Sequence, residues 1–544
     1  MKNTLYYGDN LKVLHQHVRD ESVDLVYLDP PFKSDQNYNV LFAEQNGTRS
    51  AAQVRAFEDT WRWDQAAAAA YHQVVEAGGR VSMVMQAFRQ ALGENDVLAY
   101  LAMMAPRVVE LHRVLKPTGS IYLHCDPTAS HYLRMLMDAV FGPPNFRNEI
   151  VWLRTLSKGL MTKRLPTNHD VILAYQKAED AKWNPDAVFM PYDPENLDPK
   201  TARKYRRRDP DGRQYHLDNL INPNPDRPNL TYEFLGVTRV WRWTKERMQR
   251  AFENGLIVQP RPGAVPRLKR YLDEQRGRPL GDVWTDIPPI NSQAAERLGY
   301  PTQKPERLLE RIIRVATSEG DLVLDPFCGC GTAVAVAHRL NRAWIGIDVT
   351  HLAISLIKHR LYSAFGDSVK ETCEIVGEPV DVQGALALAE QDPYQFQWWA
   401  LGLVGARPAE QKRGADKGID GRLFFHDDAE GQQTKQIVLS VKSGKGQVAY
   451  VRDLRGVVQR ENAAIGVLLS MHKPTAAMRS EAASGGFYHS PWGTKHPRMQ
   501  ILTVQELLEG KRIDMPPSRD LRTFKKAPKA KRKPRGGMTN LFLF

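Results

Sequence analysis

Cysteine is scarce in this 544-residue sequence, and long apolar runs are absent. The four cysteines are too few and too unevenly spaced for a disulfide framework or a four-ligand zinc site. No apolar run approaches the roughly 18 residues of a membrane-spanning helix, so no membrane is expected as a partner. The N-terminal residues lead directly into a strand-like segment, without the apolar core of a signal peptide. These absences predict a cytoplasmic protein in a reducing environment. The cysteines are Cys125, Cys328, Cys330 and Cys373.

Acidic residues are outnumbered as well. The chain has 75 Lys and Arg against 62 Asp and Glu, a formal net charge of +13 at pH 7. Such an excess favours a polyanionic partner, although a soluble protein with a basic tail is the alternative. Part of the excess lies in residues 525–535, which are lysine, arginine, proline and alanine. We therefore predict a disordered basic tail over residues 516–544 that can grip a phosphate backbone.

The stretch from Val23 to Phe32 is the one around which the other motifs are organised. Its apolar and β-branched first half predicts a buried strand, and two prolines then force a stiff loop at the carboxyl end of that strand. Methyl transfer to an exocyclic amine of a base fits this loop. The Asp29 carboxylate and the Pro30 carbonyl can accept both amine hydrogens, and Phe32 can stack on a flipped base. An ordinary Asp-Pro turn is the alternative.

A second strand–turn–helix unit follows much later in the chain. Asp321 to Asp325 predicts a strand, and Gly329-Cys330-Gly331 forms a turn before a helix. The next predicted strand ends at Asp348, where an acid can accept both hydroxyls of a ribose. The turn lacks the six-position glycine pattern that cradles a pyrophosphate. The pattern therefore favours a nucleoside without phosphates, such as S-adenosylmethionine, over NAD.

Four segments, taken in their order along the chain, carry a resemblance to a known family. They are Gly8-Asp9-Asn10, Asp29-Pro30-Pro31-Phe32, Pro301-Thr302-Gln303-Lys304-Pro305 and Asp325-Pro326-Phe327-Cys328-Gly329-Cys330-Gly331. Together they resemble the β-class amino-group DNA methyltransferases, in which the catalytic tetrapeptide precedes the cofactor loop. The resemblance covers residues 1 to about 366. It departs from the family at the two cysteines of the turn, where small residues are usual.

The resemblance implies an α/β fold with a circularly permuted, Rossmann-like, S-adenosylmethionine-dependent methyltransferase sheet. The sheet would be cut open between its second and third strands, so a catalytic half, 1–176, must pack against a cofactor-binding half, 291–366. The family implies catalytic roles for Asp29, Pro30, Pro31 and Phe32. It implies cofactor contacts by Asp9, Lys304, Asp325, Pro326, Phe327, Gly329, Gly331, Thr332 and Asp348.

The expected target atom is adenine N6 in double-stranded DNA. Asp at the first position of the tetrapeptide is usual for adenine enzymes of this family, whereas Ser is usual for cytosine-N4 enzymes, which remain the alternative. Methylation at cytosine C5 needs a thiolate nucleophile, and no Pro-Cys pair occurs in the sequence. With DNA as its partner, the protein would be cytoplasmic and nucleoid-associated. A dimer is an allowed oligomeric state, but no residue singles it out.

The segment 177–290 between the two halves has a different character. Apolar periodicity weakens, prolines cluster, and basic residues gather in 200–213 and 261–278, with aromatic residues between them. We interpret the segment as an inserted target-recognition domain that contacts DNA, with a solvated loop-rich insert as the alternative. The aromatic residues are Tyr205, Tyr232, Trp241 and Trp243.

A second α/β domain is expected over residues 390–510, where the chain resembles the Mrr-like restriction-endonuclease fold. In that fold an acid on one strand, and an acid or Gln two residues before a Lys on the next, bind Mg²⁺ and activate water. Asp420 and Lys442 fit the catalytic pattern, with Asp420 as the Mg²⁺ ligand, and Gln397 is a neutral extra ligand candidate. Ser440 stands where the acid or Gln belongs. A domain that only binds DNA is therefore the alternative to a nuclease.

The last five residues, Asn540 to Phe544, form an apolar cluster after the basic tail. They resemble the Gln-Leu-x-Leu-Phe peptides by which bacterial DNA enzymes hold the replication sliding clamp. Leu541, Leu543 and Phe544 match that spacing, while Asn540 replaces the glutamine. The alternative is that the segment adds a strand to its own second domain.

Overall fold

The computed structural model describes residues 3–31, 63–156, 165–291, 294, 296–298, 300, 302–366, 368–409, 418–427 and 434–517. The chain divides into two compact units, Met1–Trp183 with Asp282–Phe544, and Asn184–Gly281. Phe32, Asn540–Phe544 and almost all of the basic tail lie outside the described residues. Within the described part, no helix has the length and apolar character required to cross a membrane.

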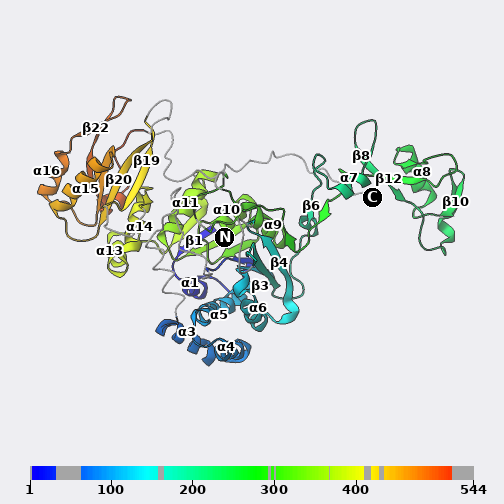
Figure 1. Ribbon diagram of the computed structural model, residues 1–544, viewed down its shortest axis with the longest axis horizontal. Coiled ribbons are helices and arrows are strands. Elements are labelled where there is room, and N and C mark those ends of the chain that lie inside the picture. The colour runs from blue at the N-terminus through cyan, green and yellow to red at the C-terminus, as the bar shows by residue number, and fades with distance from the viewer. Residues whose placement is uncertain are drawn as a thin grey trace. The chain divides into compact units, whose positions relative to one another are not determined.

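The first unit contains a nine-stranded sheet with the order β14-β4-β5-β3-β2-β15-β16-β1-β17 (Figure 1). The run from β3 to β17 is parallel, and β5 is antiparallel to both of its neighbours. A mixed α/β fold with a large, mostly parallel sheet is thereby confirmed. The strands are β1 (Asn3–Tyr7), β2 (Val23–Leu28), β3 (Leu115–Cys125), β4 (Phe146–Leu153), β5 (His169–Gln176), β14 (Val283–Trp284), β15 (Leu322–Asp325), β16 (Ala343–Asp348) and β17 (Cys373–Val376).

Strand β15 lies in the middle of this sheet although it comes late in the sequence. It pairs with β2 on one side and with β16 on the other, and β16 pairs in turn with β1. Because these four strands are parallel, their carboxyl ends meet at one edge of the sheet. The loops that begin at Gly8, Asp29, Pro326 and Val349 therefore start side by side.

Helices cover both faces of the sheet, because the apolar side chains of β2 point alternately to one face and the other and need cover on both. Val26 and Leu28 point into one apolar core, Leu25 and Tyr27 into the other, and all four are buried. The first core is closed by α1 (Asn10–His17), α3 (Gln65–Glu76), α4 (Gly79–Leu92), α5 (Asp96–Val114) and α6 (Pro127–Phe141). The second is closed by α9 (Glu306–Ala316), α10 (Thr332–Arg339) and α11 (His351–Phe365).

Strand β3 follows α5 without a loop between them. Helix α5 ends at Val114 and β3 begins at the next residue, so Lys116 to Gly119 lie within the strand. The reason is the neighbouring strand. Lys116 Nζ lies 2.7 Å from the Asp24 carboxylate, and a Cβ on Gly119 would lie 3.0 Å from the Asp24 backbone carbonyl oxygen of β2. The glycine therefore allows β3 to lie close to β2, and the register shifts at this point.

The second unit has its own small core and short strands. A four-stranded sheet, β11-β12-β8-β7, lies with the hairpin β9–β10, the two-stranded antiparallel sheet β6–β13 and the helices α7 (Pro199–Lys204) and α8 (Lys245–Glu253). The strands are β6 (Phe189–Met190), β7 (Arg207–Arg208), β8 (Gln214–Asn219), β9 (Thr231–Phe234), β10 (Val237–Val240), β11 (Ile257–Val258), β12 (Arg267–Tyr271) and β13 (Arg278–Pro279). This unit is shorter than the predicted insert, since 177–183 and 282–290 belong to the first unit.

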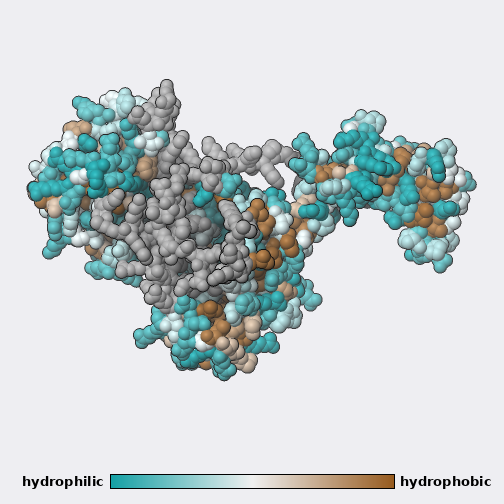
Figure 2. All heavy atoms as spheres, viewed as in Figure 1, coloured by the Kyte–Doolittle hydropathy of each residue, from teal (hydrophilic) through white to brown (hydrophobic). Residues whose placement is uncertain are grey.

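The aromatic residues of this unit are used differently from the expectation. Trp241 is fully buried and Tyr205 is 2% exposed, so both fill the interior rather than lie open to a partner. The Tyr232 hydroxyl donates to the carbonyl of Trp243. The three arginines 206–208 are exposed, and Figure 2 shows a hydrophilic face over α7 and β8. Basic side chains, not aromatic rings, are thus what this unit presents to solvent there.

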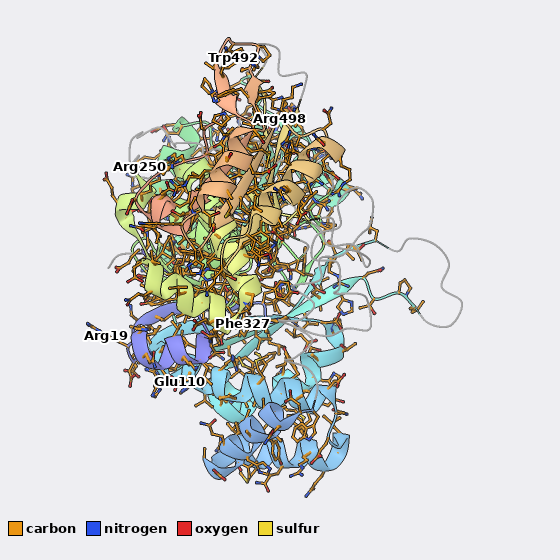
Figure 3. The ribbon with its side chains drawn as sticks, turned by 90° about the vertical axis from the view of Figure 1, so that its left-hand side faces the viewer. Arg19, Glu110, Arg250, Phe327, Trp492 and Arg498 are labelled. Atoms are coloured by element: carbon orange, nitrogen blue, oxygen red, sulfur yellow. The ribbon has the colours of Figure 1, made fainter. Side chains whose placement is uncertain are left out.

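The C-terminal residues of the first unit form a five-stranded sheet, β18-β19-β20-β21-β24, with helices against both faces. Trp492, labelled in Figure 3, lies between the strands of a separate hairpin, β22–β23. Helix α13 packs with α14 in the same core. The elements are α13 (Val382–Gln391), α14 (Pro393–Leu403), β18 (Arg407–Pro408), β19 (Gly421–Phe425), β20 (Lys435–Lys442), α15 (Val448–Arg460), β21 (Ile465–Ser470), α16 (Ala476–Ala483), β22 (Phe487–His489), β23 (Lys495–Pro497), β24 (Met499–Thr503) and α17 (Val504–Leu508). Short α12 (Val369–Thr372) and three 3₁₀ turns, Pro143–Asn145, Pro185–Val188 and Pro228–Leu230, complete the described helices.

We expect Asp24→Ala to destabilise the first unit markedly. Asp24 is 4% exposed, and its Oδ2 accepts from the Leu322 backbone N–H and from Lys116. Removing it leaves a buried donor of β15 without its acceptor, which costs about 2 to 3 kcal/mol. Urea unfolding followed by tryptophan fluorescence measures the shift. Asp20→Ala removes a carboxylate whose side chain is 74% exposed and should change little. Equal shifts for the two variants would contradict the assignment.

Candidate active site

The acid of the tetrapeptide lies where β2 ends, and a lysine from a distant segment holds it. Asp29 Oδ2 lies 2.5 Å from Lys304 Nζ, which comes from the segment just before α9. Both side chains are partly exposed, while Pro30 is buried behind them. The ion pair fixes the carboxylate relative to the later part of the chain. Lys304, which the family resemblance assigned to the cofactor, therefore contacts the predicted catalytic acid.

A buried polar network lies beside Asp29 on three neighbouring strands. The Tyr27 hydroxyl lies 3.1 Å from His124 Nδ1, and His124 Nε2 lies 2.9 Å from Asp170 Oδ2. Arg154 lies 3.1 Å from the other oxygen of that carboxylate. Burial opposes ionisation of Asp170, but the His124 hydrogen bond and the charges of Lys304 and Arg154 lower its pKa. With Asp170 ionised, Nε2 of His124 carries the hydrogen that it donates to this carboxylate.

Sequence analysis missed this network because no one segment contains it. Tyr27, His124 and Asp170 each looked like one polar residue in an apolar strand. The signal that could have found them is the strand order, since β2, β3 and β5 are neighbours. Polar side chains at the adjoining ends of three buried strands need one another as hydrogen-bond partners.

The glycine turn between β15 and α10 lies at the same edge of the sheet. Gly329 and Gly331 have φ values of 52° and 71°, which side chains disfavour. A Cβ on Gly331 would lie 2.7 Å from Ile357 Cγ1, and one on Gly329 would lie 3.1 Å from the Tyr300 ring. The turn therefore needs glycine both for its backbone conformation and for its close packing. Phe327, labelled in Figure 3, precedes the turn and is partly buried.

Asp348, at the end of β16, binds the turn directly. Its Oδ2 accepts from the Gly329 N–H at 2.9 Å, and its Oδ1 accepts from the N–H and hydroxyl of Thr350. Burial raises the pKa of Asp348 to about 6 despite these donors. Burial likewise raises the pKa of Asp325 to about 8, although the Phe327 N–H donates to it. The site thus contains two buried acids, Asp325 and Asp348, whose ionised forms are disfavoured by desolvation.

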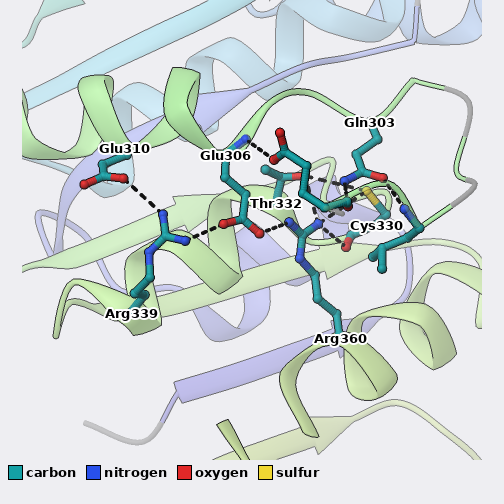
Figure 4. A network of polar contacts seen from close by, with 9 residues as sticks. Gln303, Glu306, Glu310, Cys330, Thr332, Arg339 and Arg360 are labelled. Atoms are coloured by element: carbon teal, nitrogen blue, oxygen red, sulfur yellow. Dashed lines mark hydrogen bonds and ion pairs between the residues drawn. The ribbon is translucent and has the colours of Figure 1, made fainter. Parts of the chain in front are cut away.

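Thr332 is held by an arginine that sequence analysis did not single out. Arg360 of α11 is 1% exposed and donates to the Thr332 hydroxyl, to the Cys330 carbonyl and to Glu306 (Figure 4). Glu306 also pairs with Arg339 of α10. The buried guanidinium thereby ties the start of α10, the glycine turn and the start of α9 together. In the sequence, Arg360 is one basic residue in an amphipathic helix, so nothing marked it.

The segment after β1 joins the same edge. Asp9 caps α1 by accepting from the Lys12 N–H, and it pairs with Arg107 of α5 at 2.7 Å. Asn10 donates to the Pro326 carbonyl at 2.8 Å, and the Gly8 N–H donates to the Asp348 carbonyl. The structure therefore brings Asp9, Pro30, Pro31 and Asp29 to one edge with Asp325, Pro326, Gly329 and Asp348. A contact between Asp9 and the cofactor remains a prediction.

The two cysteines of the turn are packing residues. Both are buried, and burial raises the pKa of each thiol. A Cβ on Gly346 would lie 2.6 Å from Cys328 Sγ, so the sulfur fills the space beside β16. A buried thiol of raised pKa is a poor nucleophile, which agrees with chemistry that does not use cysteine.

The second predicted site, in the C-terminal sheet, does not fit a metal ion. Asp420 Oδ2 accepts from the Val441 N–H at 2.6 Å and from the Ser440 hydroxyl at 3.0 Å. Its Oδ1 accepts from the Gln397 amide, and Lys442 Nζ lies 3.8 Å from Oδ2. Mg²⁺ prefers carboxylate oxygens, but here one carboxylate is surrounded by donors. Among the described residues, no group of three or more His, Cys, Asp or Glu could hold a metal.

The sequence matches the DNA methylase family of N6 and N4 methyltransferases over residues 23–359. The chain therefore belongs to this family, whose members are S-adenosylmethionine-dependent DNA methyltransferases. Residues 394–509 match a second family, described as NACHT-associated inactive restriction endonuclease 1. The C-terminal domain is thus restriction-endonuclease-like, and the description "inactive" agrees with the environment of Asp420.

Three curated relatives are similar over most of the methylase part. The Type II methyltransferase M.EcaI of Enterobacter cloacae is 26% identical over 66% of this chain and 69% of its own length. The Mod subunit of the Type III restriction-modification enzyme StyLTI of Salmonella typhimurium is 22% identical over 62% of this chain and 50% of its own length. The DNA adenine methyltransferase YhdJ of Escherichia coli is 23% identical over 68% of this chain and 87% of its own length.

We expect binding of S-adenosylmethionine to weaken below about pH 6. The pKa of Asp348 is raised to about 6, so the carboxylate that would accept the ribose hydroxyls becomes protonated as the pH falls through that value. If only the ionised form binds, affinity falls up to about tenfold for each pH unit below 6. Calorimetric titration across the range measures this. Asp348→Asn should bind weakly with no such step, and a flat profile for the natural chain would refute the prediction.

Proposed function

We propose that this protein is a site-specific DNA methyltransferase that modifies adenine N6 in duplex DNA. The observation that carries the proposal is the Asp29–Lys304 pair at the edge where the Gly329 turn and Asp348 meet. A similar adenine methyltransferase, YhdJ, supports adenine as the target. Cytosine N4 remains the alternative, because both amines belong to the chemistry of the family.

The residues at this edge fit S-adenosylmethionine. Asp348 would hold the ribose hydroxyls, and the Gly329–Gly331 turn offers backbone without side chains against which a nucleoside can lie. Asp9, Lys304, Pro326, Phe327 and Thr332 are further predicted contacts. When bound there, S-adenosylmethionine supplies an activated methyl group.

Asp29 and Pro30 would prepare the amine of the target base. A carboxylate has about four lone-pair positions, so Asp29 can accept an amine hydrogen while it keeps Lys304. The Pro30 carbonyl would accept the second hydrogen, and the amine nitrogen lone pair is then drawn out of conjugation with the ring. After transfer, the extra proton on nitrogen lies against the Asp29 carboxylate, which is the nearest base. Phe32 is the predicted stacking partner, and Pro31 stiffens the loop.

The strand order supports a circular permutation of the methyltransferase sheet. Its first two strands would be β15 and β16, and β1 and β2 would be the third and fourth. The unit Asn184–Gly281 would be the inserted target-recognition domain, with its exposed arginines on phosphates.

A sliding clamp as a partner of Asn540–Phe544 and a dimeric state remain predictions. The StyLTI relative supports a role in restriction-modification or defence.

The product of the reaction tests the proposal. We expect the protein, given labelled S-adenosylmethionine and mixed-sequence duplex DNA, to place label in N6-methyladenine after digestion to nucleosides. Asp29→Ala should lose more than about a thousandfold in transfer rate, because an unoriented amine is a poor nucleophile. Its affinity for S-adenosylmethionine should stay close to that of the natural chain.

Two results would contradict the proposal. Label found only in N4-methylcytosine would establish the alternative target. An active Asp29→Ala variant would remove Asp29 from the catalytic role. Asp20→Ala is the matched control, since it removes an exposed carboxylate elsewhere and should leave transfer unchanged.

For the C-terminal domain we propose DNA binding without hydrolysis. The donors around Asp420 leave it as a hydrogen-bond acceptor that joins β20 to α14. Lys442 would contribute positive charge, and an Mrr-like nuclease activity is the alternative. Among the residues that the structure describes, no group of three or more His, Cys, Asp or Glu accompanies Asp420 to bind Mg²⁺.

We therefore expect no Mg²⁺- or Mn²⁺-dependent nicking of unmethylated plasmid by the full chain. The matched control is the double variant Asp420→Ala/Lys442→Ala, assayed on the same supercoiled DNA by gel electrophoresis. Nicking by the natural chain that the double variant loses would show that this site is a nuclease after all.

A further inference from the structure

Helix α14 of the C-terminal domain packs against α11, the helix that begins just after Asp348. Gln395, Trp398 and Gly402 lie on one face of α14, since they are three and four residues apart. A Cβ on Gly402 would lie 2.5 Å from the hydroxyl of Ser355 in α11. This close approach places the second domain against the helix that leads out of the predicted cofactor site.

Gln395 satisfies a buried donor at the start of α11. Its Oε1 accepts from the His351 N–H at 3.1 Å, three residues after Asp348. The His351 ring in turn stacks on Tyr7 with the ring centroids 3.6 Å apart. Tyr7 directly precedes Gly8, whose N–H donates to the Asp348 carbonyl. One glutamine of the second domain is thus linked to two loops of the candidate site.

Trp398 reaches the same site by apolar contact. It is 5% exposed and packs with Leu352 and Leu356 of α11, and Tyr300 packs against this cluster. The Tyr300 ring lies beside the Gly329 turn, within 3.1 Å of where a Cβ on Gly329 would be. Trp398 therefore belongs to the cluster against which the aromatic ring beside the turn packs. In contrast, the neighbouring Trp399 faces the core of its own domain.

We propose that α14 forms the outer wall of the S-adenosylmethionine site, with Trp398 and Gln395 as positioning residues. Trp398 acts through Tyr300 on the Gly329 turn, and Gln395 acts through His351 on the start of α11. The restriction-endonuclease-like domain is then an integral part of the methyltransferase. This inference rests on the proposed function, because it assumes that the cofactor lies at this edge.

Two adjacent tryptophans give a matched test in the full-length chain. Trp398→Ala should weaken S-adenosylmethionine binding about tenfold by calorimetry. In the transfer assay it should raise KM for S-adenosylmethionine while kcat at saturation is retained. Trp399→Ala removes an equally large buried side chain, so it should lower thermal stability but keep affinity within about twofold. Trp398→Phe, which keeps an aromatic ring in the cluster with Leu352 and Leu356, should recover most of the affinity.

A second measurement is independent of any loss of folding. Coupling between two sites is reciprocal, so S-adenosylmethionine should slow amide hydrogen exchange in residues 393–403 of the natural chain. Gln395→Ala removes the polar contact without a large cavity and should weaken binding about threefold. Near-ultraviolet circular dichroism establishes that each variant is folded.

The results separate this inference from the proposed function. Equal affinities for Trp398→Ala and Trp399→Ala, or unchanged exchange in α14, would overturn the inference while the natural chain still methylates DNA. A natural chain that binds no S-adenosylmethionine would overturn both.

Discussion

The structure depends on the pairing of β15 with β2, two strands that lie about 300 residues apart in the sequence. Val323 pairs with Leu25, and Leu324 pairs with Val26, in the middle of the nine-stranded sheet. Asp24 adds a side-chain acceptor for the Leu322 N–H. Without this junction neither half has a complete sheet, and Asp29 loses its ion pair with Lys304. The candidate site forms only because strands from both halves pair in one sheet.

Charged side chains around the site form buried ion pairs and hydrogen bonds with partners on several helices and strands. Arg360, paired with Glu306, binds the glycine turn on one side, and the His124–Asp170 pair lies near Asp29 on the other. Buried ion pairs of this kind add little net stability, because desolvation offsets their attraction. Their value is geometric, since a buried charge has few places where its hydrogen bonds can be satisfied. The loops at this edge are therefore held in one arrangement.

The linear motifs and most core elements could be predicted from the sequence, because each is encoded within a few residues. Asp29, the Gly329 turn and Asp348 each come at or just after the end of a strand that its apolar run predicts. Arg360, Tyr27 and Trp398 could not be found in this way, since their partners lie on other elements. Trp241 was misread for the same reason: an aromatic residue among arginines is read as a binding residue until the core behind it is known. The start of β3 at Leu115 could not be predicted from the sequence, because the pairing of β3 with β2 overrides the local turn preference of Lys116 to Gly119.

The central position of β15 and β16 also has a consequence for how the chain is made. Strands β1 and β2 leave the ribosome early, but the strands that separate them are synthesised on the order of tens of seconds later. Until then β2 lacks a partner on its β15 side, and β1 lacks its neighbour β16. An unpaired, largely apolar strand edge invites association with other chains. This strand order thus exposes the nascent chain to association with other chains, and it favours slow folding through contacts that are distant in sequence.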